Sequence, residues 1–459
     1  MERYDLLVVG GGLCGLAAAK QAADLGAKVV VAEPGPLGGT CINRGGVPKK
    51  ALVRSATVYR LALDAGRFGV VTGPVTANWK MALERMDELV RLLQRNEAAA
   101  LQDRDVAWIS GKASFLSPHQ LVVGDRQVQT EHVILAAGSR PWLPKVPGLD
   151  SAITSDQFFE SRELPRDALI VGGGVIALEF AHIWNAFGVK VTLLEIGDRI
   201  LAGIDAELAE QVARISADRG IDIISEARVT SVSRDGDRLS VEAFVLDSAV
   251  KYAVDTVLVA AGRVPVTDGM MLDAAGVRVQ NGRIATNEYL QTAASHIYAA
   301  GDAIGGHSLA TVATYEGRLA ARNALRGNVE KLDLRLVPTT VFTLPPLSTV
   351  GLSETQGRET AAGVQVTRLP FDAVEGALVH GDTDGMIKII SEAGSGRILG
   401  THILGARSEE LIHEFAIAMR ANMSLPQLGE VIPIHPSFSE GAIGAALTSG
   451  SGRVQSYCG

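Results

Sequence analysis

The sequence of 459 residues predicts an α/β fold with two Rossmann-like nucleotide-binding domains and a C-terminal α+β domain. A glycine-rich turn between an apolar strand and a helix occurs near residue 10, and the same construction returns near residue 172. After Val337, apolar and polar residues alternate, as from Met386 to Ile390, which is typical of strands in a smaller mixed domain. The length also exceeds what one hydrophobic core supports, so about three domains are expected.

Composition and charge narrow the class of protein. Hydrophobic residues make up 47% of the chain and charged residues 20%, as in a folded, water-soluble protein. The net charge is −8 without a basic tract, and no apolar run reaches the length of a membrane span, so neither nucleic acid nor a membrane is expected as a partner. Three cysteines cannot form a secreted disulfide framework, and the first residues leave no room for a signal peptide, so we expect a cytoplasmic protein. The nine histidines lack ligand spacing, and no metal site is expected.

The first nucleotide-binding unit begins with a predicted strand over residues 5–10, which runs into the turn of residues 10–15. A helix is expected from Leu16 to Gly26, followed by a strand over residues 27–32 that ends in an acidic residue. Glycines in such a turn let backbone N–H groups approach a pyrophosphate, and an acid at the end of the second strand suits a ribose diol. The expected nucleotide contacts are Gly10, Gly12, Gly15 and Glu33.

The second unit repeats this construction over residues 168–195. A strand over residues 168–171 leads into the turn of residues 172–177, then a helix reaches Gly188 and a strand over residues 189–194 ends in an acid. The third glycine of each turn, Gly12 or Gly174, stands 21 positions before the acid in both units. The expected contacts are Gly172, Gly174, Ala177 and Glu195. Residues 133–141 also match residues 257–265, each a buried strand closed by a glycine turn, which indicates two related domains.

The segment from Gly38 to Lys50 resembles the redox-active helix of the flavoprotein disulfide reductases, the family of glutathione reductase, dihydrolipoamide dehydrogenase and mercuric reductase. Residues 297–302 resemble the second flavin motif of this family. Residues 434–440 resemble its C-terminal His–Glu motif, and the resemblance covers essentially the whole chain.

The resemblance implies a division into domains. Residues 1–148 and 270–335 would form one discontinuous FAD-binding domain, and residues 149–269 would form the NAD(P)-binding domain inserted into it. Residues 336–459 would form a dimerisation domain with a flexible C-terminal tail.

The same resemblance implies FAD and NAD(H) as cofactors. Beyond the first turn, the expected FAD contacts are Gly39, Thr40, Gly138 and Asp302, and Gly262 is a further expected contact of the nicotinamide nucleotide. Glu195 would accept the 2′-hydroxyl of NAD(H) and repel the 2′-phosphate of NADP(H), which makes NADP(H) the less favoured cofactor. Arg199, four positions later, is the candidate ligand if a 2′-phosphate binds.

By resemblance, Cys41 is the substrate-facing thiol, and Gly46 stands where the family has a flavin-proximal cysteine. An ion pair beside the flavin is implied between Glu179 and either Lys49 or Lys50, and only one of these lysines is expected to make it. With glycine at position 46, no disulfide can form within this helix.

The C-terminal motif implies a shared active site. In the family the histidine of this motif reaches the partner subunit's active site as general base for the thiol, and the glutamate orients it. His435 and Glu440 are expected to take these roles, and the chain is expected to be a homodimer.

Three functions are compatible with the glycine at position 46. In the first, Cys41 handles a thiol, disulfide or persulfide, and an exogenous thiol or Cys458 replaces the missing cysteine. In the second, electrons leave the flavin directly, as in a diaphorase, oxidase or transhydrogenase. In the third, the chain is an inactive flavoprotein that serves as an assembly subunit. Cys14, within the first turn, is expected to be structural.

Overall fold

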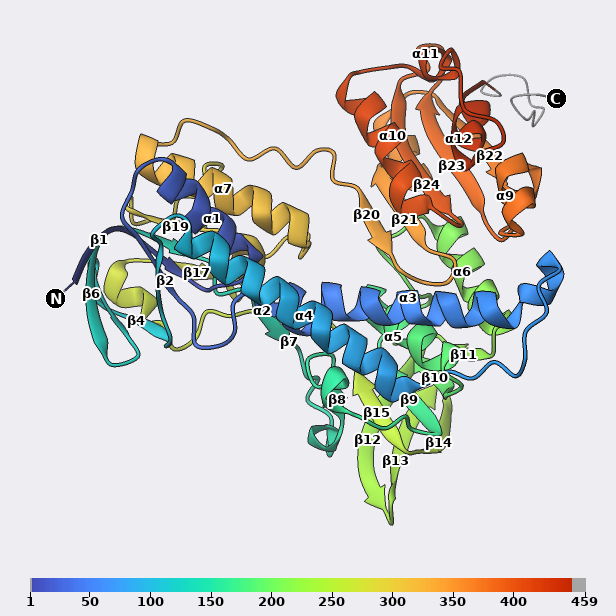
Figure 1. Cartoon of the computed structure of the whole chain (residues 1–459), viewed down its shortest axis with the longest axis horizontal. Helices are drawn as coiled ribbons and strands as arrows, with labels where there is room; N and C mark the ends of the chain where they lie inside the picture. The colour runs from blue at the N-terminus through green and yellow to red at the C-terminus, as the bar shows by residue number, and fades with distance from the viewer. Residues whose placement is uncertain (1, 448–459) are drawn as a thin grey trace.

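A computed structural model describes residues 2–447, which form three lobes around three main sheets (Figure 1). The first lobe combines the N-terminal strands with a segment near residue 300, and the third holds the C-terminal residues. Two long helices, α3 (Gly46–Leu63) and α4 (Trp79–Gln102), cross the centre of the molecule between the lobes. No helix among residues 2–447 is long and apolar enough to cross a bilayer.

The first sheet has the strand order β3-β2-β1-β6-β5-β4, and β19 pairs with β6. Its strands are β1 (Glu2–Val9), β2 (Val29–Ala32), β3 (Ala107–Ile109), β4 (Ala113–Ser117), β5 (Gln120–Val123), β6 (Arg126–Leu135) and β19 (Ile297–Ala299). Pairs β1–β2, β1–β6, β2–β3 and β19–β6 are parallel, whereas β4, β5 and β6 form an antiparallel meander. All of β2 is buried, as expected for a parallel strand that is covered on both faces.

Helices α1 (Leu13–Asp24) and α7 (Ala310–Arg326) lie side by side against this sheet (Figure 1). A Cβ at residue 317 of α7 would lie 2.1 Å from the carbonyl oxygen of Cys14, so only Gly317 permits this approach. Cys14 is buried at the contact and forms no disulfide. Helix α1 begins at Leu13 rather than at Leu16, because Gly12 of the turn is its N-cap.

The second sheet is parallel, with the order β11-β10-β9-β15-β8. Its strands are β8 (Ile153–Thr154), β9 (Asp167–Val171), β10 (Lys190–Leu194), β11 (Ile221–Ile224) and β15 (Thr256–Val259). Helices α5 (Val175–Ala186) and α6 (Ala206–Asp218) belong to this lobe, together with an antiparallel sheet of β12 (Ala227–Asp235), β13 (Arg238–Val245) and β14 (Ser248–Val254). The two segments that match in sequence meet, because β7 (Ser139–Pro141) pairs with β16 (Arg263–Pro265).

The third sheet is antiparallel, with the order β20-β21-β24-β23-β22. Its strands are β20 (Thr339–Val341), β21 (Leu347–Gly351), β22 (Val364–Pro370), β23 (Met386–Glu392) and β24 (Ile398–Leu404). The helices of this lobe are α8 (Glu354–Thr360), α9 (Glu375–His380), α10 (Ser408–Arg420), α11 (Leu425–Gly429) and α12 (Phe438–Leu447). This confirms the predicted α+β character of the C-terminal part.

The alternation that predicted β23 does not produce a solvated face. Lys388 is only 2% exposed, because its ammonium group binds the carboxylates of Asp205 at 2.8 Å, Glu207 at 2.8 Å and Glu354 at 2.9 Å. A buried ammonium group is tolerated only with such compensation. Since Asp205 is the N-cap of α6 and Glu207 lies within α6, this ion cluster joins the second lobe to the third.

The remaining elements are short. They are α2 (Gly39–Arg44), strands β17 (Val279–Gln280) and β18 (Arg283–Ile284), and the 3-10 helices Ala65–Phe68, Leu149–Ser151, Phe158–Glu160, Leu272–Ala275, Gly301–Ile304 and Phe371–Ala373.

Candidate active site

Cys41 lies beside a break between two helices, which corrects the expectation of one continuous redox-active helix. It belongs to α2, and Gly45, with φ −142° and ψ −103°, separates α2 from α3. The break turns the N-terminus of α3 toward the thiol, so that the backbone N–H groups of Gly46 and Val47 hydrogen-bond the sulfur of Cys41. Neither α2 nor α3 has a side-chain cap, which leaves these N–H groups available to the sulfur.

The backbone at residue 46 keeps the geometry of a disulfide partner. A Cβ built on Gly46 would lie 3.0 Å from Sγ of Cys41; apart from the neighbouring residues and the backbone of α3 itself, the other atom within 4 Å is the Cys41 carbonyl oxygen at 3.7 Å. In a disulfide, bond lengths and angles separate the Cβ of one cysteine from the sulfur of the other by about 3.0 Å. The second sulfur is absent, but the space for it is present.

Burial raises the pKa of the Cys41 thiol above its usual range, although Lys50, the two N–H groups and Lys49 oppose this effect. The thiol form is therefore favoured more strongly than in an exposed cysteine. A nucleophilic role would require a base that removes the proton.

Glu179 of α5 forms ion pairs with both candidate lysines. Nζ of Lys49 lies 2.5 Å from Oε2 and Nζ of Lys50 lies 2.9 Å from Oε1. The expectation that only one lysine makes this ion pair was wrong, because each carboxylate oxygen lies within ion-pair distance of a different ammonium group. Burial of Glu179 opposes ionisation, but the two lysines outweigh it and hold the pKa of Glu179 below its usual range. Burial also lowers the pKa of Lys50, despite the attraction of Glu179.

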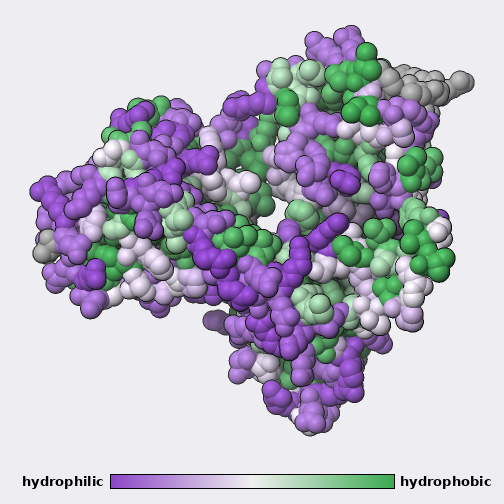
Figure 2. All heavy atoms as spheres, in the orientation of Figure 1, coloured by the Kyte–Doolittle hydropathy of each residue, from purple (hydrophilic) through white to green (hydrophobic). Residues whose placement is uncertain are grey.

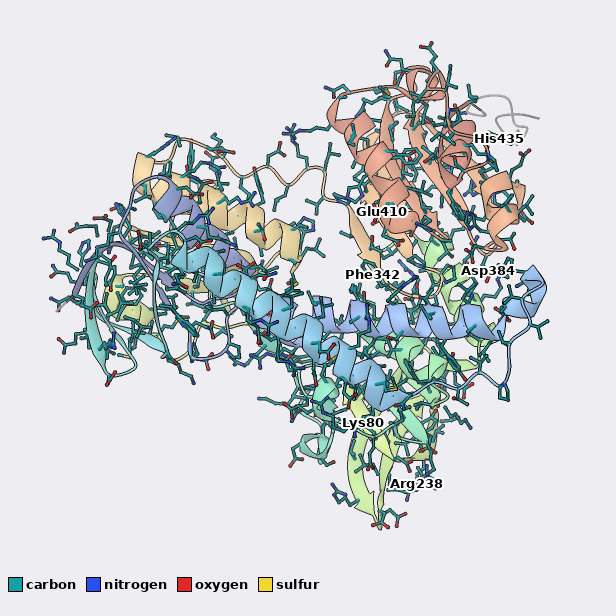
Figure 3. The ribbon with its side chains drawn as sticks, in the orientation of Figure 1. Lys80, Arg238, Phe342, Asp384, Glu410 and His435 are labelled. Atoms are coloured by element: carbon teal, nitrogen blue, oxygen red, sulfur yellow. The ribbon has the colours of Figure 1, made fainter. Side chains whose placement is uncertain are left out.

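Phe342 completes this cluster at the centre of the molecule (Figure 3). Its backbone N–H donates a hydrogen bond of 3.1 Å to Oε1 of Glu179, and its ring lies 4.1 Å from Nζ of Lys50. Residues of α3, of α5 and of the segment after β20 therefore meet at Glu179. The charged cluster lies where the three lobes join.

Both glycine-rich turns fit a pyrophosphate. The N-caps of α1 and α5 are Gly12 and Gly174, and neither helix has a side-chain cap. A Cβ on Gly174 would meet nothing within 4 Å, and one on Gly12 would meet only Cα of Gly39 at 3.7 Å. The unpaired N–H groups at both helix starts are thus open to an anionic ligand.

The acids at the ends of β2 and β10 are held in the same way. The carboxylate of Glu33 accepts hydrogen bonds from the N–H groups of Gly11 at 2.7 Å and Gly35 at 2.8 Å. The carboxylate of Glu195 accepts from those of Gly173 and Gly197. Each acid therefore lies beside its own glycine-rich turn, as a ribose-binding acid must.

Arg199 is engaged elsewhere. Its guanidinium group donates to the carbonyl oxygens of Leu201 at 3.0 Å and Ala202 at 2.8 Å, with longer contacts to those of Ile200 and Ile204. The side chain thus stabilises the loop of residues 199–204. Its guanidinium group is therefore not available as the phosphate ligand that the sequence suggested.

Asp302 is linked to the second lobe through side chains that the sequence analysis missed. Its carboxylate accepts a hydrogen bond of 2.5 Å from the hydroxyl of Ser139, and Arg263 donates to that hydroxyl at 2.9 Å and to the Ser139 carbonyl oxygen at 2.8 Å. Arg263 also pairs with Asp156 at 3.1 Å. The pairing of β7 with β16 creates this contact, which no local motif indicates.

The remaining predicted contacts surround the same two turns. A Cβ on Gly15 would lie 1.8 Å from the carbonyl oxygen of Gly10, so the first turn can only close with glycine there. Ala177 is buried in the first turn of α5, and Thr40 belongs to α2. Gly10, Gly39, Gly138, Gly172 and Gly262 all have positive φ angles.

A buried acid, Glu316 of α7, lies beneath the Asp302 loop. Its carboxylate accepts a hydrogen bond of 2.7 Å from the N–H of Gly301. Burial, with a smaller contribution from Asp302, raises the pKa of Glu316 to about 7. This residue was also missed, because nothing in the helical sequence distinguishes it from a surface glutamate.

His435 and Glu440 form the predicted pair. Nδ1 of His435 lies 2.7 Å from Oε2 of Glu440, whose Oε1 accepts a hydrogen bond of 3.1 Å from the N–H of Gly376. Oε2 of Glu375, which the sequence analysis missed, lies 3.3 Å from Nε2 of His435. The ligand atoms of these three side chains lie within 4.8 Å of one another, a spacing that could hold a metal ion and that the sequence analysis did not anticipate.

His435 and Cys41 do not meet within one chain. His435 lies at the outer edge of the third lobe (Figure 3), whereas α2, which carries Cys41, lies near the centre of the molecule (Figure 1). Cys458 lies outside the described residues.

The chain is similar to known proteins over its whole length. Residues 4–317 match the model of the pyridine nucleotide-disulphide oxidoreductase family, and residues 337–446 match the dimerisation domain of that family. Relatives include a dihydrolipoyl dehydrogenase of Bacillus subtilis, 36% identical over 98% of both chains. A glutathione reductase of Nostoc is 34% identical over 95% of this chain and 98% of its own. A mercuric reductase of Staphylococcus aureus is 33% identical over 97% of this chain and 82% of its own.

A Cu(II) complex of the HOCl-induced flavoprotein disulfide reductase RclA from Escherichia coli has a similar structure. Its TM-score is 0.88 at 32% identity, over 96% of this chain and 98% of that chain. The family consists of enzymes that use FAD and NAD(P)H, and both glycine-rich turns fit such nucleotides. From these matches, the chain belongs to the pyridine nucleotide-disulphide oxidoreductase family.

Proposed function

We propose that this enzyme oxidises NADH and passes the electrons, by way of FAD, to a thiol- or disulfide-type substrate at Cys41, without an internal disulfide. The observation that carries this proposal is the setting of Cys41. Its sulfur faces the N-terminus of α3 and two lysines, whereas position 46 has the spacing of a disulfide partner but no sulfur.

We assign FAD to the first glycine-rich turn and NAD(H) to the second. FAD would be held by the N-terminus of α1, by Glu33 and by Asp302, within a domain of residues 1–148 and 270–335. The nicotinamide nucleotide would bind within residues 149–269. When bound, FAD supplies a group that accepts a hydride and gives up two electrons. The fit of these turns to a pyrophosphate supports the assignment.

NADH is the preferred reductant in this proposal. The Glu195 carboxylate lies beside the second turn, where it would accept a hydrogen bond from the ribose 2′-hydroxyl and repel a 2′-phosphate. The hydrogen bonds of Arg199 to backbone carbonyl oxygens keep its charge from offsetting that repulsion.

The cluster of Lys49, Lys50 and Glu179 would hold fixed charge next to the reacting groups. The Glu179 side chain is only 1% exposed and is paired with both lysines, so its carboxylate group is held in one orientation. Lys50, which is adjacent to both Cys41 and Glu179, would stabilise a thiolate as it forms.

The base for Cys41 would come from a second copy of the chain, with residues 336–459 as the dimerisation domain. His435 binds Glu440 through Nδ1, and Nε2 lies 3.3 Å from the carboxylate of Glu375. Because the Glu375 side chain is 42% exposed, it can move aside, and Nε2 would then exchange a proton with a substrate thiol. Apolar surface lies along the right-hand edge of the view in Figure 2. Helix α9, which carries Glu375 beside this histidine, has two exposed apolar side chains, Leu378 and Val379. Phe68 and Val71, which follow α3 in the chain, are also exposed. Burial of these side chains between two subunits would bring His435 toward the partner's Cys41.

The proposal is tested with a Cys41→Ser variant in the FAD-loaded protein. Stopped-flow reduction of the flavin by NADH should be unchanged within about twofold, whereas turnover of low-mass disulfides should be lost. Full disulfide turnover by the variant would contradict the proposal. It would favour a second candidate, direct transfer from the flavin to an acceptor, which the glycine at position 46 also supports.

A further inference from the structure

We propose that Cys41 takes up a single sulfane sulfur atom from a hydropersulfide or polysulfide, forming Cys41–S–SH with its outer sulfur in the open position beside Gly46. This inference rests on the proposed function and names its substrate class. The outer sulfur replaces the cysteine sulfur that residue 46 lacks.

The space at Gly46 fits one sulfur atom bonded to Cys41. The Cβ position of residue 46 lies 3.0 Å from Sγ of Cys41; apart from the neighbouring residues and the backbone of α3 itself, the other atom within 4 Å is the Cys41 carbonyl oxygen at 3.7 Å. A sulfur bonded to Sγ at about 2.05 Å can occupy the position that a second cysteine sulfur would have, without meeting a Cβ. Among the described residues the other cysteine is Cys14, which is buried within the contact between α1 and α7. No second thiol of that part of the chain therefore competes for this place.

Charge favours a persulfide over a mixed disulfide at this position. The N–H groups of Gly46 and Val47 hydrogen-bond the sulfur of Cys41, and the charges of Lys50 and Lys49 favour a negative charge on it. The outer sulfur of a persulfide ionises more readily than a thiol, and these groups stabilise the anion. In a mixed disulfide with an organic thiol, the second sulfur is bonded to carbon and is neutral. The N–H groups and the lysines therefore do not stabilise it.

The chemistry balances in two steps. The Cys41 thiolate attacks the outer sulfur of R–S–SH. The substrate S–S bond breaks, the Cys41–S–SH bond forms, and R–S⁻ leaves and takes up a proton. Two electrons and two protons then convert Cys41–S–SH to Cys41–SH and hydrogen sulfide. The reduced pyridine nucleotide supplies both electrons, so that NADH, H⁺ and R–S–SH give NAD⁺, R–SH and hydrogen sulfide. His435 of the partner subunit would protonate the departing thiolate.

The experiment exposes the FAD-loaded protein to sodium polysulfide without oxygen, removes the excess and measures the mass of the peptide that contains Cys41. We expect one added sulfur on Cys41, which NADH then releases as one sulfide per subunit. Gly46→Ala places a Cβ 3.0 Å from Sγ and should lower the yield of the adduct roughly tenfold. Gly66→Ala is the matched control, because a Cβ there meets nothing within 4 Å, and its yield should equal that of the unmodified protein.

Two results would overturn the inference. One is the absence of added sulfur on Cys41 while the same cysteine forms a mixed disulfide with glutathione disulfide. The other is an equal yield in Gly46→Ala and the unmodified protein. Failure of the proposed function looks different, since it would appear as full disulfide turnover by Cys41→Ser, or as flavin that NADH does not reduce, whether or not the sulfur adduct forms.

Discussion

Replacement of Gly46 by cysteine should restore a disulfide with Cys41. The Cβ would lie 3.0 Å from Sγ of Cys41, which matches the separation across a disulfide, about 3.0 Å. Gly46 does not have a positive φ angle, so its backbone accepts a side chain. Closing a loop of about six residues restricts the unfolded chain and should add about 2 kcal/mol to the free energy of unfolding.

The assay counts free thiols in the denatured Gly46→Cys variant before and after reduction, and compares urea unfolding of the two forms. The oxidised protein should have two fewer free thiols than the reduced protein, and it should unfold at a higher urea concentration. The double variant Cys41→Ser, Gly46→Cys is the control, and its unfolding should not respond to reduction. If both thiols of Gly46→Cys stay free under oxidising conditions, the geometry inferred for residue 46 is wrong.

Three other predictions concern the charged groups. Flavin reduction should be faster with NADH than with NADPH. Glu195→Ser should narrow this difference in rate roughly 10- to 100-fold, because it removes a repulsion of about 1–3 kcal/mol between the carboxylate and the 2′-phosphate. A selective loss of the NADPH rate in Arg199→Ala would show that this arginine binds the phosphate after all. Lys388→Met leaves Asp205, which is 3% exposed, without its ammonium partner, and it should lower the free energy of unfolding in urea by about 3–5 kcal/mol. The control is Arg358→Met, which removes an exposed pair with Glu354 and should lower that free energy by less than about 1 kcal/mol. Glu316 has a pKa raised from 4.5 to about 7 in the folded chain. Between about pH 4.5 and pH 7 the folded form therefore binds more protons than the unfolded form. The contribution of protonated Glu316 to the free energy of unfolding is fully present below about pH 4.5 and is lost as the pH rises to about 7. The loss should be about 2–3 kcal/mol in the FAD-free protein, and Glu316→Gln should abolish it; an unchanged pH slope in that variant would show that another group titrates.

Local features of the sequence predicted both nucleotide-binding turns in position and in kind. The reason is that a strand, a glycine turn, a helix and an acid form one continuous unit, and the structure places Glu33 and Glu195 in matching surroundings. The C-terminal α+β lobe was also predicted, but Lys388 was not recognised as buried. Its carboxylate partners come from α6 and α8, which lie far from β23 in the sequence.

Contacts between segments that lie far apart in the sequence could not be predicted in the same way. Glu375 of α9 approaches His435, which precedes α12, and Arg263 reaches Ser139 only because β7 and β16 pair. The choice between the two lysines depended on the orientation of α3 relative to α5, which the sequence does not encode locally. The break at Gly45 was missed because glycine permits both a helical and an extended conformation.

The central claim is that the enzyme holds one redox group, the flavin, and no internal disulfide. The most direct test is an anaerobic titration of the FAD-loaded protein with NADH, which counts the electrons taken up per flavin. The account predicts that the flavin bleaches with one NADH per subunit, in the unmodified protein and in Cys458→Ser alike. Uptake of two NADH per subunit by the unmodified protein, falling to one in Cys458→Ser, would contradict the claim and show that the C-terminal cysteine completes a dithiol with Cys41.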